Sequence, residues 1–203
     1  MNLPNKLTIL RIIMIPFFMI FAVPIPQTLI DLPALSAMSQ GMRAFNEFIG
    51  GSGWWIAGTI FVLAFITDAL DGFIARKYNL ITDFGKFLDP IADKLLVTAA
   101  IIALVEQQRL SSWIAVVIIS REFIVTGVRL LAATQGVVIA AGNIGKLKTV
   151  FQTIALTLML FYNFRLAFLN AIYLDDICML VAFVLTVVSG VDYILKNKHL
   201  LKA

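Results

Sequence analysis

Residues 67–94 read TDALDGFIARKYNLITDFGKFLDPIADK, a stretch in which acidic and basic side chains collect between long apolar runs. The whole chain of 203 residues is 61% hydrophobic and only 14% charged. Soluble globular domains are about 45–50% apolar and about 25% charged. The composition therefore predicts an integral membrane protein, and the charged stretch is expected at a membrane surface, where ionised side chains stay hydrated.

Six apolar stretches have roughly the 20 residues that a helix needs to cross a bilayer. They are residues 7–26, 53–75, 86–106, 110–134, 147–168 and 171–195. We predict an all-α integral membrane protein, a six-transmembrane-helix bundle that forms a single domain over residues 1–203. The first stretch, with Lys6 and Arg11, also has the form of a secretory signal peptide, which is the alternative interpretation.

Lys and Arg gather at alternate ends of these spans, so the positive-inside rule places both termini and residues 67–94 on the cytoplasmic side. The net charge of +4 belongs to these loops. Because no basic stripe is interleaved with exposed aromatic residues, nucleic acid is not an expected partner. The single cysteine, Cys178, excludes an internal disulfide and a CxxC metal site.

The longest connection, residues 27–53, mixes apolar and charged residues. It is long enough for a short interfacial helix on the outer side of the membrane. Trp54 and Trp55 follow it directly and are predicted to anchor the next span at the interface.

The acidic residues of the opening stretch recur at helical spacing. Asp68 and Asp71 lie three residues apart, on one face of the second span. Gly85, Asp89 and Asp93 follow at intervals of four, on one face of the third span if that helix begins near Gly85. Spans joined by a short loop are usually antiparallel neighbours, so the two carboxylate pairs are predicted to converge.

Four converging carboxylates repel one another unless cations lie among them. Hard oxygen ligands favour Mg²⁺, Mn²⁺ or Ca²⁺ over zinc, and four of them suffice for a two-metal site of the kind that serves phosphoryl transfer. Pro90 is expected to kink the helix if it lies beyond the first turn, and Asp83 to be hydrated on the opposite side. The alternative is a salt-bridge network with Arg76, Lys86 and Lys94.

Small residues accompany the carboxylates. Gly72 and Ala75 share the face of Asp68 and Asp71, where they would let a phosphate or nucleotide approach the backbone. Arg76 would grip phosphate with its planar guanidinium, although it also suits a plain topology anchor.

These residues together form the pattern D-x2-D-G-x2-A-R-x8-G-x3-D-x3-D, which resembles the signature of the CDP-alcohol phosphatidyltransferases. All eight positions fit: Asp68, Asp71, Gly72, Ala75, Arg76, Gly85, Asp89 and Asp93. The resemblance implies that the four aspartates hold two divalent cations, Mg²⁺ or Mn²⁺, and that Asp93 is also the general base. It further implies that the Gly, Ala and Arg positions contact the CDP moiety.

Longer stretches, NLPNKLTILR, GKFLDPIADKLL, SREFIVTGVRLLA and IGKLKT, resemble the bacterial phosphatidylglycerophosphate synthases of this family. The likeness implies CDP-diacylglycerol as donor, glycerol 3-phosphate as acceptor and a multi-pass position in the bacterial cell membrane. It also implies that Asn5, Thr8 and Thr82 face the nucleotide, although a helix cap for Asn5 and a loop hydroxyl for Thr82 fit equally. Family members are often homodimers, so a homodimer is a further expectation.

Charges within or beside the fourth and fifth spans are costly in a membrane and therefore usually functional or paired. Arg121 and Glu122 are adjacent and would point in different directions, which argues against a pair within the helix. We predict that Arg121, Arg129, Lys146 and Lys148 bind the acceptor phosphate. The alternative for each lysine is a positive-inside loop charge.

Two other functions remain open. The same chemistry with another acceptor, inositol phosphate or phosphatidylglycerol, keeps every donor-side residue. A divalent-cation transporter would instead spread ionisable residues through the membrane depth. The only histidine, His199, lies in the basic tail and is expected to be exposed and not catalytic.

Overall fold

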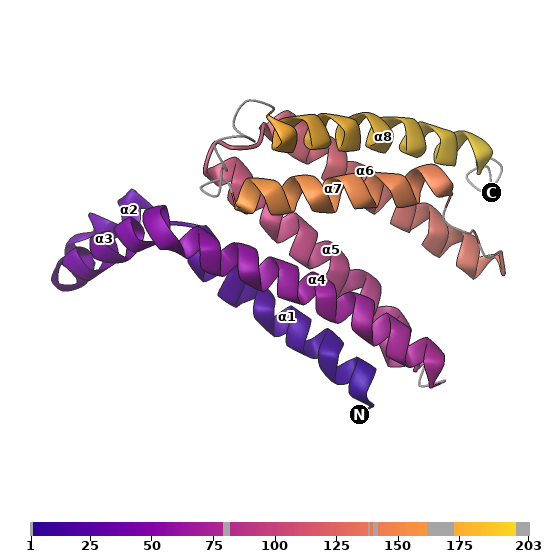
Figure 1. The fold of residues 1–203 in the computed structure, drawn as a ribbon, viewed down its shortest axis with the longest axis horizontal. Coiled ribbons are helices and arrows are strands. Elements are labelled where there is room, and N and C mark those ends of the chain that lie inside the picture. The colour runs from indigo at the N-terminus through magenta and orange to yellow at the C-terminus, as the bar shows by residue number, and fades with distance from the viewer. Residues whose placement is uncertain (1, 79–81, 138, 140–141, 162–172, 198–203) are drawn as a thin grey trace. The chain divides into compact units, whose positions relative to one another are not determined.

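The computed structural model describes residues 2–78, 82–137, 139, 142–161 and 173–197. Within that range the side chains of Leu3, Pro4, Ala69, Asp71, Ala75, Arg76, Asp83, Phe84, Lys86 and Phe87 are not described. The described residues form helices and no strand (Figure 1). The helices are α1 (Leu3–Ala22), α2 (Gln27–Ile30), α3 (Ser39–Phe48), α4 (Trp54–Lys77), α5 (Asp83–Glu106), α6 (Ser112–Thr134), α7 (Asn143–Leu160) and α8 (Leu174–Lys196), with a 3₁₀ turn at Pro33–Met38 and a π turn at Ile49–Gly53.

Each predicted span corresponds to a helix, which confirms the all-α class. Three helical segments of the described chain are long and apolar enough to cross a membrane: Asn5–Ala22, Pro33–Ile74 and Leu174–Lys196. α5, α6 and α7 carry charged side chains within their length. The six crossings and the cytoplasmic termini therefore stay predictions. The end of the fifth predicted span and His199 lie outside the described residues.

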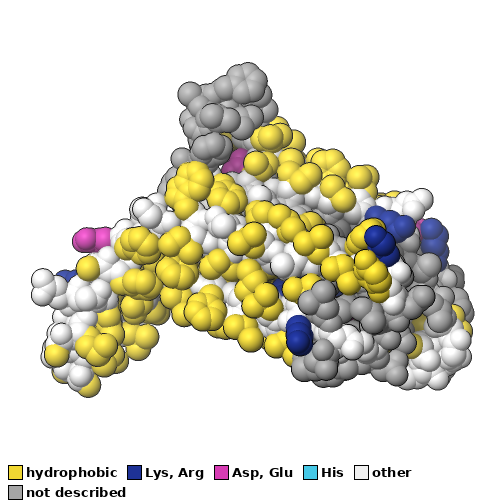
Figure 2. Space-filling model, turned by 60° about the horizontal axis from the view of Figure 1, so that its bottom comes forward, with side chains coloured by type: hydrophobic (Ala, Val, Ile, Leu, Met, Phe, Trp, Pro, Cys, Tyr) yellow, Lys and Arg dark blue, Asp and Glu magenta, His cyan; other side chains and the backbone are white. Residues whose placement is uncertain are grey.

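The exposed surface is that of a membrane protein. Figure 2 shows hydrophobic side chains spread over much of the described surface. On α8 the exposed apolar residues recur every three or four positions, at Ile177, Leu180, Val184, Val187, Val191 and Leu195. A soluble helix carries polar residues on its outer face, so this stripe is suited to lipid. Cys178 lies on the buried side of the same helix.

The chain divides into two compact units, Met1–Gln107 and Gln108–Ala203. In unit 1, α1 packs along α4 and α5 (Figure 1). The rings of Phe18 and Phe61 lie 6.3 Å apart between α1 and α4, and Ala57 and Ala64 are fully buried. Small residues let helices approach closely, which is how spans pack where no water drives them together.

Unit 2 is built on α8, against which both α6 and α7 pack. Ile118 on α6, Leu156 on α7 and Ala182 on α8 are fully buried. Alternate helices of a bundle run in the same direction, so α6 and α8 point one way and α7 the other. Arg121 and Glu122 of α6, Lys148 of α7 and Ser189 of α8 contact one another within this packing.

The connection between α1 and α4 contains the predicted short helix, α3. Asn46 ties it to the end of α1, since its side chain accepts from Ile25 N at 2.8 Å and donates to Ile25 O at 2.9 Å. Of the two predicted interface anchors, Trp55 is 40% exposed, whereas Trp54 is 2% exposed and belongs to the core. Only Trp55 therefore has the exposure that an anchor needs.

Candidate active site

A polar stripe on α1 faces the interior of unit 1. Asn5, Thr8 and Arg11 are spaced three residues apart, so they share one face of the helix. All three are buried, with Thr8 and Arg11 each 1% exposed. Buried polar groups need partners, and in this unit the partners come from α4 and α5.

The start of α5 is bonded to this stripe. Thr8 Oγ1 donates to Asp89 Oδ1 at 2.6 Å, and Thr82 Oγ1 donates to Asn5 Oδ1 at 2.8 Å. Thr82 Oγ1 also accepts from Gly85 N at 3.0 Å, which caps the helix that begins at Asp83. Thr82 is thus a helix cap, and Asn5 is not, because the N-cap of α1 is Asn2.

Gly85 of α5 lies against the Asn5 side chain of α1. A Cβ atom there would stand 3.0 Å from Asn5 Oδ1 and 3.2 Å from Thr82 Oγ1. Both oxygens are already engaged with each other, so a larger residue would push apart the hydrogen bond that joins the two helices. The glycine of the signature is explained here by the chain's own packing.

Asp89 and Asp93 lie on one face of α5, as their spacing predicted. α5 begins at Asp83 and runs without interruption through Pro90 to Glu106, so Asp89 and Asp93 lie one turn apart on one face. Both are half-buried.

Asp68 has an unforeseen partner. Arg11 Nη1 lies 2.6 Å from Asp68 Oδ1, and Arg11 Nε donates to Ala64 O at 3.3 Å, one turn earlier on α4. A buried arginine of the first helix thus supplies a positive charge to Asp68. The alternative network with Arg76, Lys86 and Lys94 stays a prediction, because the side chains of Arg76 and Lys86 lie outside the described ones.

Several predicted site residues lie outside the described side chains: Asp71, Ala75 and Arg76, together with Asp83 and Lys86 of the same stretch. Among the described side chains, no group of three or more potential metal ligands is gathered. The arrangement of the four aspartates around cations therefore stays a prediction.

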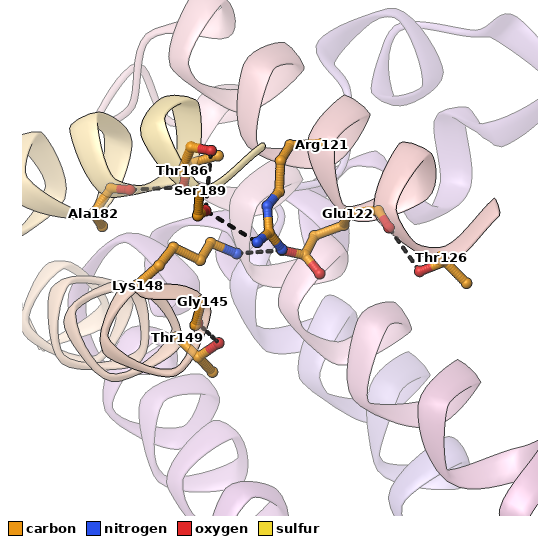
Figure 3. Close-up of polar contacts among 9 residues, drawn as sticks. All are labelled: Arg121, Glu122, Thr126, Gly145, Lys148, Thr149, Ala182, Thr186 and Ser189. Atoms are coloured by element: carbon orange, nitrogen blue, oxygen red, sulfur yellow. Dashed lines mark hydrogen bonds and ion pairs between the residues drawn. The ribbon is translucent and has the colours of Figure 1, made fainter. Parts of the chain in front are cut away.

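In unit 2, charged residues of α6 and α7 meet beside α8 (Figure 3). Glu122 Oε1 is paired with Lys148 Nζ and, at 3.1 Å, with Arg121 Nη1. Arg121 Nη2 donates to Ser189 Oγ of α8 at 3.0 Å. We call Arg121, Glu122, Lys148 and Ser189 the cationic cluster.

The prediction that Arg121 and Glu122 do not pair was wrong. Their Cα–Cβ bonds diverge on the helix, as expected of neighbours, but both side chains are long enough for Arg121 Nη1 to reach Glu122 Oε1, which also pairs with Lys148 of α7. Adjacent positions therefore do not exclude a pair when both side chains are long and flexible.

Only two of the four residues predicted to bind the acceptor phosphate lie together in the structure. Arg121 and Lys148 come together, and the Lys148 side chain is 3% exposed. Arg129 lies over the ring of Tyr193, 5.8 Å from its centroid, and Lys146 is exposed. The two-residue spacing between Lys146 and Lys148 sends them to different faces of α7.

Similarity to known proteins covers both units. The family model of the CDP-alcohol phosphatidyltransferases matches residues 1–188. The chain belongs to the CDP-alcohol phosphatidyltransferase family. A CDP-diacylglycerol--glycerol-3-phosphate 3-phosphatidyltransferase of Bacillus subtilis (strain 168) is 44% identical over 202 residues, which are 99% of this chain and 97% of the relative.

Two other relatives also align with 95% of this chain. An enzyme of the same name from Rickettsia bellii is 38% identical over 196 residues, covering 95% of this chain and 93% of the relative. A probable phosphatidylglycerophosphate synthase of Mycobacterium tuberculosis is 37% identical over 198 residues, covering 95% and 80%. The resemblance drawn from the signature is thereby confirmed.

Three residues of this phosphatidyltransferase have contacts that sequence reasoning missed. Arg11 at the start of a span is explained by the positive-inside rule alone, although its spacing from Asn5 and Thr8 indicates a polar stripe in an apolar helix. Glu122 was noticed but given no partner. Ser189 gave no signal, because a single hydroxyl in an apolar span is common and bonds to its own helix backbone as readily as to a ligand.

Proposed function

We propose that this chain transfers the phosphatidyl group of CDP-diacylglycerol to glycerol 3-phosphate, giving phosphatidylglycerophosphate and CMP. The observation that carries the proposal is the 44% identity to the Bacillus subtilis enzyme over nearly the full length of both chains. That alignment spans both units, so it takes in the carboxylates of the signature and the cationic cluster alike.

The carboxylate site would hold the divalent cations and the donor diphosphate. Its ligand set, Asp68, Asp71, Asp89 and Asp93, is made of hard oxygen donors, which fit two Mg²⁺ or Mn²⁺ ions. Bound there, such ions neutralise the acids and stabilise charge that develops on phosphate oxygens. Thr8 and Arg11 orient Asp89 and Asp68 from α1.

The chemical step needs a base and a leaving group. We assign Asp93 as the base that takes the proton from the primary hydroxyl of glycerol 3-phosphate. The resulting oxygen attacks the lipid-side phosphorus of the diphosphate, and the bond from that phosphorus to the oxygen of CMP breaks. Arg76 stabilises the departing phosphate, while Gly72, Ala75 and Gly85 leave room for the nucleotide, together with Asn5 and Thr82.

The cationic cluster would receive the phosphate of the acceptor. An arginine fork and an ammonium group are the side chains that bind phosphate most strongly, and Arg121 and Lys148 are held together by a shared carboxylate. Arg129 and Lys146 lie apart from them and would attract the acceptor at longer range.

The chemistry would take place at the cytoplasmic membrane surface. There a water-soluble acceptor meets a lipid donor whose acyl chains stay among the spans, so no phosphate has to enter the hydrocarbon layer. The six-span topology, the cytoplasmic termini and a homodimeric form belong to the same proposal.

The test is a comparison of acceptors. Purified protein in detergent is given CDP-diacylglycerol with glycerol 3-phosphate, inositol phosphate or phosphatidylglycerol in turn, and the lipid product is identified by mass spectrometry. We expect phosphatidylglycerophosphate and an equal amount of CMP with glycerol 3-phosphate, lost in EDTA and restored by Mg²⁺ or Mn²⁺. If a lipid product forms only with inositol phosphate or only with phosphatidylglycerol, that compound is the acceptor and the proposed reaction is wrong.

A further inference from the structure

We propose that Glu122 is a positioning residue that holds Arg121 and Lys148 together as a preformed phosphate receptor. The inference rests on the proposed function, because it concerns how the acceptor is bound. Glu122 contacts the two cations and is not assigned any contact with the reacting atoms. Its role is to fix where the positive charges lie before the acceptor arrives.

The shared oxygen is the first observation. Glu122 Oε1 accepts from Arg121 of its own helix and from Lys148 of α7. Two cations in a poorly hydrated place repel each other strongly, and a lysine stem is flexible enough to move away. One carboxylate oxygen between them turns this repulsion into two attractive contacts.

The guanidinium of Arg121 is also fixed from its other side. Nη2 donates to Ser189 Oγ, and the Ser189 hydroxyl donates to Thr186 O at 3.2 Å, which leaves its lone pairs to face the arginine. The chain at Gly190 lies against the arginine stem, where a Cβ atom would be 3.1 Å from Arg121 Cγ. Contacts from α6 and α8 therefore define one position for this side chain.

The charge of the cluster suits an anion. Two cations and one carboxylate leave a net positive charge, and a phosphate monoester carries about −1.5 to −2 near neutral pH. Glu122 thus orders the cations without cancelling them. A receptor that is ordered in advance loses less entropy when the ligand binds, so the benefit should be seen in acceptor affinity.

The experiment measures kinetics of Glu122→Gln in the full-length protein. Glutamine keeps the shape but loses the charge that holds both cations. We expect the KM for glycerol 3-phosphate to rise about tenfold or more, with the KM for CDP-diacylglycerol within about twofold of the wild-type value. Inorganic phosphate is used as an inhibitor that competes with the acceptor, and its inhibition constant should rise by a similar factor.

Asp192→Asn is the matched control. It removes the same charge from an exposed pair on α8, where Asp192 and Lys196 lie 2.8 Å apart, and both KM values should stay unchanged. A folded Glu122→Gln protein with wild-type acceptor KM, or one in which only kcat or the donor KM changes, overturns the proposal.

A second variant covers the case in which glutamine prevents folding. Glu122→Asp keeps the charge but is one methylene shorter, so it cannot reach both cations equally, and the acceptor KM should rise about threefold. An unchanged KM in this variant also overturns the proposal. Wild-type protein is assayed in parallel, and its failure to make phosphatidylglycerophosphate would instead remove the proposed function.

Discussion

The two units carry polar clusters of opposite sign that are built on the same plan. In the described part of unit 1, acids of α4 and α5 are accompanied by the buried cation Arg11 of α1. In unit 2, cations of α6 and α7 are accompanied by one acid, Glu122. In each, a hydroxyl side chain from a neighbouring helix completes the bonding, Thr8 in the first and Ser189 in the second.

The two clusters differ in the sign of the charge that is not balanced within each cluster. Among the described side chains, the cluster of unit 1 keeps an excess of carboxylate oxygen, with Asp68, Asp89 and Asp93 beside Arg11, which suits cations and a diphosphate bound through them. Unit 2 keeps an excess of positive charge, which suits a phosphate directly. Under the proposed function this difference is a division of labour, in which the acids handle the donor and the cations handle the acceptor. The following variants test each half.

The largest effect is expected from Asp93→Asn. Without the base, turnover should fall by about 10²–10⁴-fold, while binding of CDP changes much less, because Asp68, Asp71 and Asp89 remain as ligands for the cations. CMP release and equilibrium CDP binding are measured on the same preparation. Asp31→Asn, at an exposed residue paired with Arg43, should keep full turnover. Unaltered CMP release by Asp93→Asn would remove Asp93 as the base.

Arg11→Gln tests the counter-charge of unit 1. It leaves Asp68 without its buried partner, although the Asp68 side chain is itself 37% exposed and stays partly hydrated. The free energy of unfolding in detergent should therefore fall by about 1–3 kcal/mol, less than for a fully buried pair. Arg43→Gln breaks an exposed pair at 3.1 Å and should cost about 0–1 kcal/mol. Equal losses in the two variants would show that Arg11 contributes no more than a surface charge.

Gly85→Ala tests the junction between α1 and α5. The added Cβ meets Asn5 Oδ1 at 3.0 Å, so the helices must shift by a few tenths of an ångström. Misplacing catalytic groups by about 1 Å can cost about 10²-fold, and we expect turnover to fall about tenfold. Gly41→Ala, where no atom lies within 4 Å, should leave turnover unchanged. Full activity of Gly85→Ala would mean that this contact is not needed for catalysis.

The smallest effect is expected from Gly190→Ala in unit 2. Its Cβ would press on the flexible stem of Arg121, so the KM for glycerol 3-phosphate should rise only about threefold. Gly127→Ala on α6 meets no atom within 4 Å and should slightly stabilise the helix. A change in the donor KM of Gly190→Ala would contradict the assignment of Arg121 to the acceptor.

The sequence predicted the helices and the shared face of Asp89 and Asp93 well, because both depend on local periodicity. Long apolar runs place α1 and α4–α8 within a few residues, and the intervals between Asp89, Asp93 and Gly85 follow from the helix alone. The continuity of α5 through Pro90 could not be read from the proline itself, since the surrounding helix decides whether it is tolerated.

The counter-charges could not be predicted for a different reason. Arg11 and Asp68 lie far apart in the sequence, and an arginine near the end of a span is explained equally well as a topology signal. The sequence prediction for Glu122 considered only its neighbour Arg121, although Glu122 also pairs with Lys148 of α7. The contacts that complete each cluster are tertiary, and no local spacing encodes them.

The division of labour is tested most directly by the binding of both ligands to Lys148→Met. Equilibrium binding of radiolabelled glycerol 3-phosphate and of CDP is measured for wild type, Lys148→Met and, as the matched control on the same helix, Lys146→Met. We predict that Lys148→Met binds glycerol 3-phosphate about tenfold more weakly or worse and CDP as wild type does, with Lys146→Met close to wild type for both. Wild-type binding of glycerol 3-phosphate by Lys148→Met, or an equal loss of CDP binding, would contradict the account.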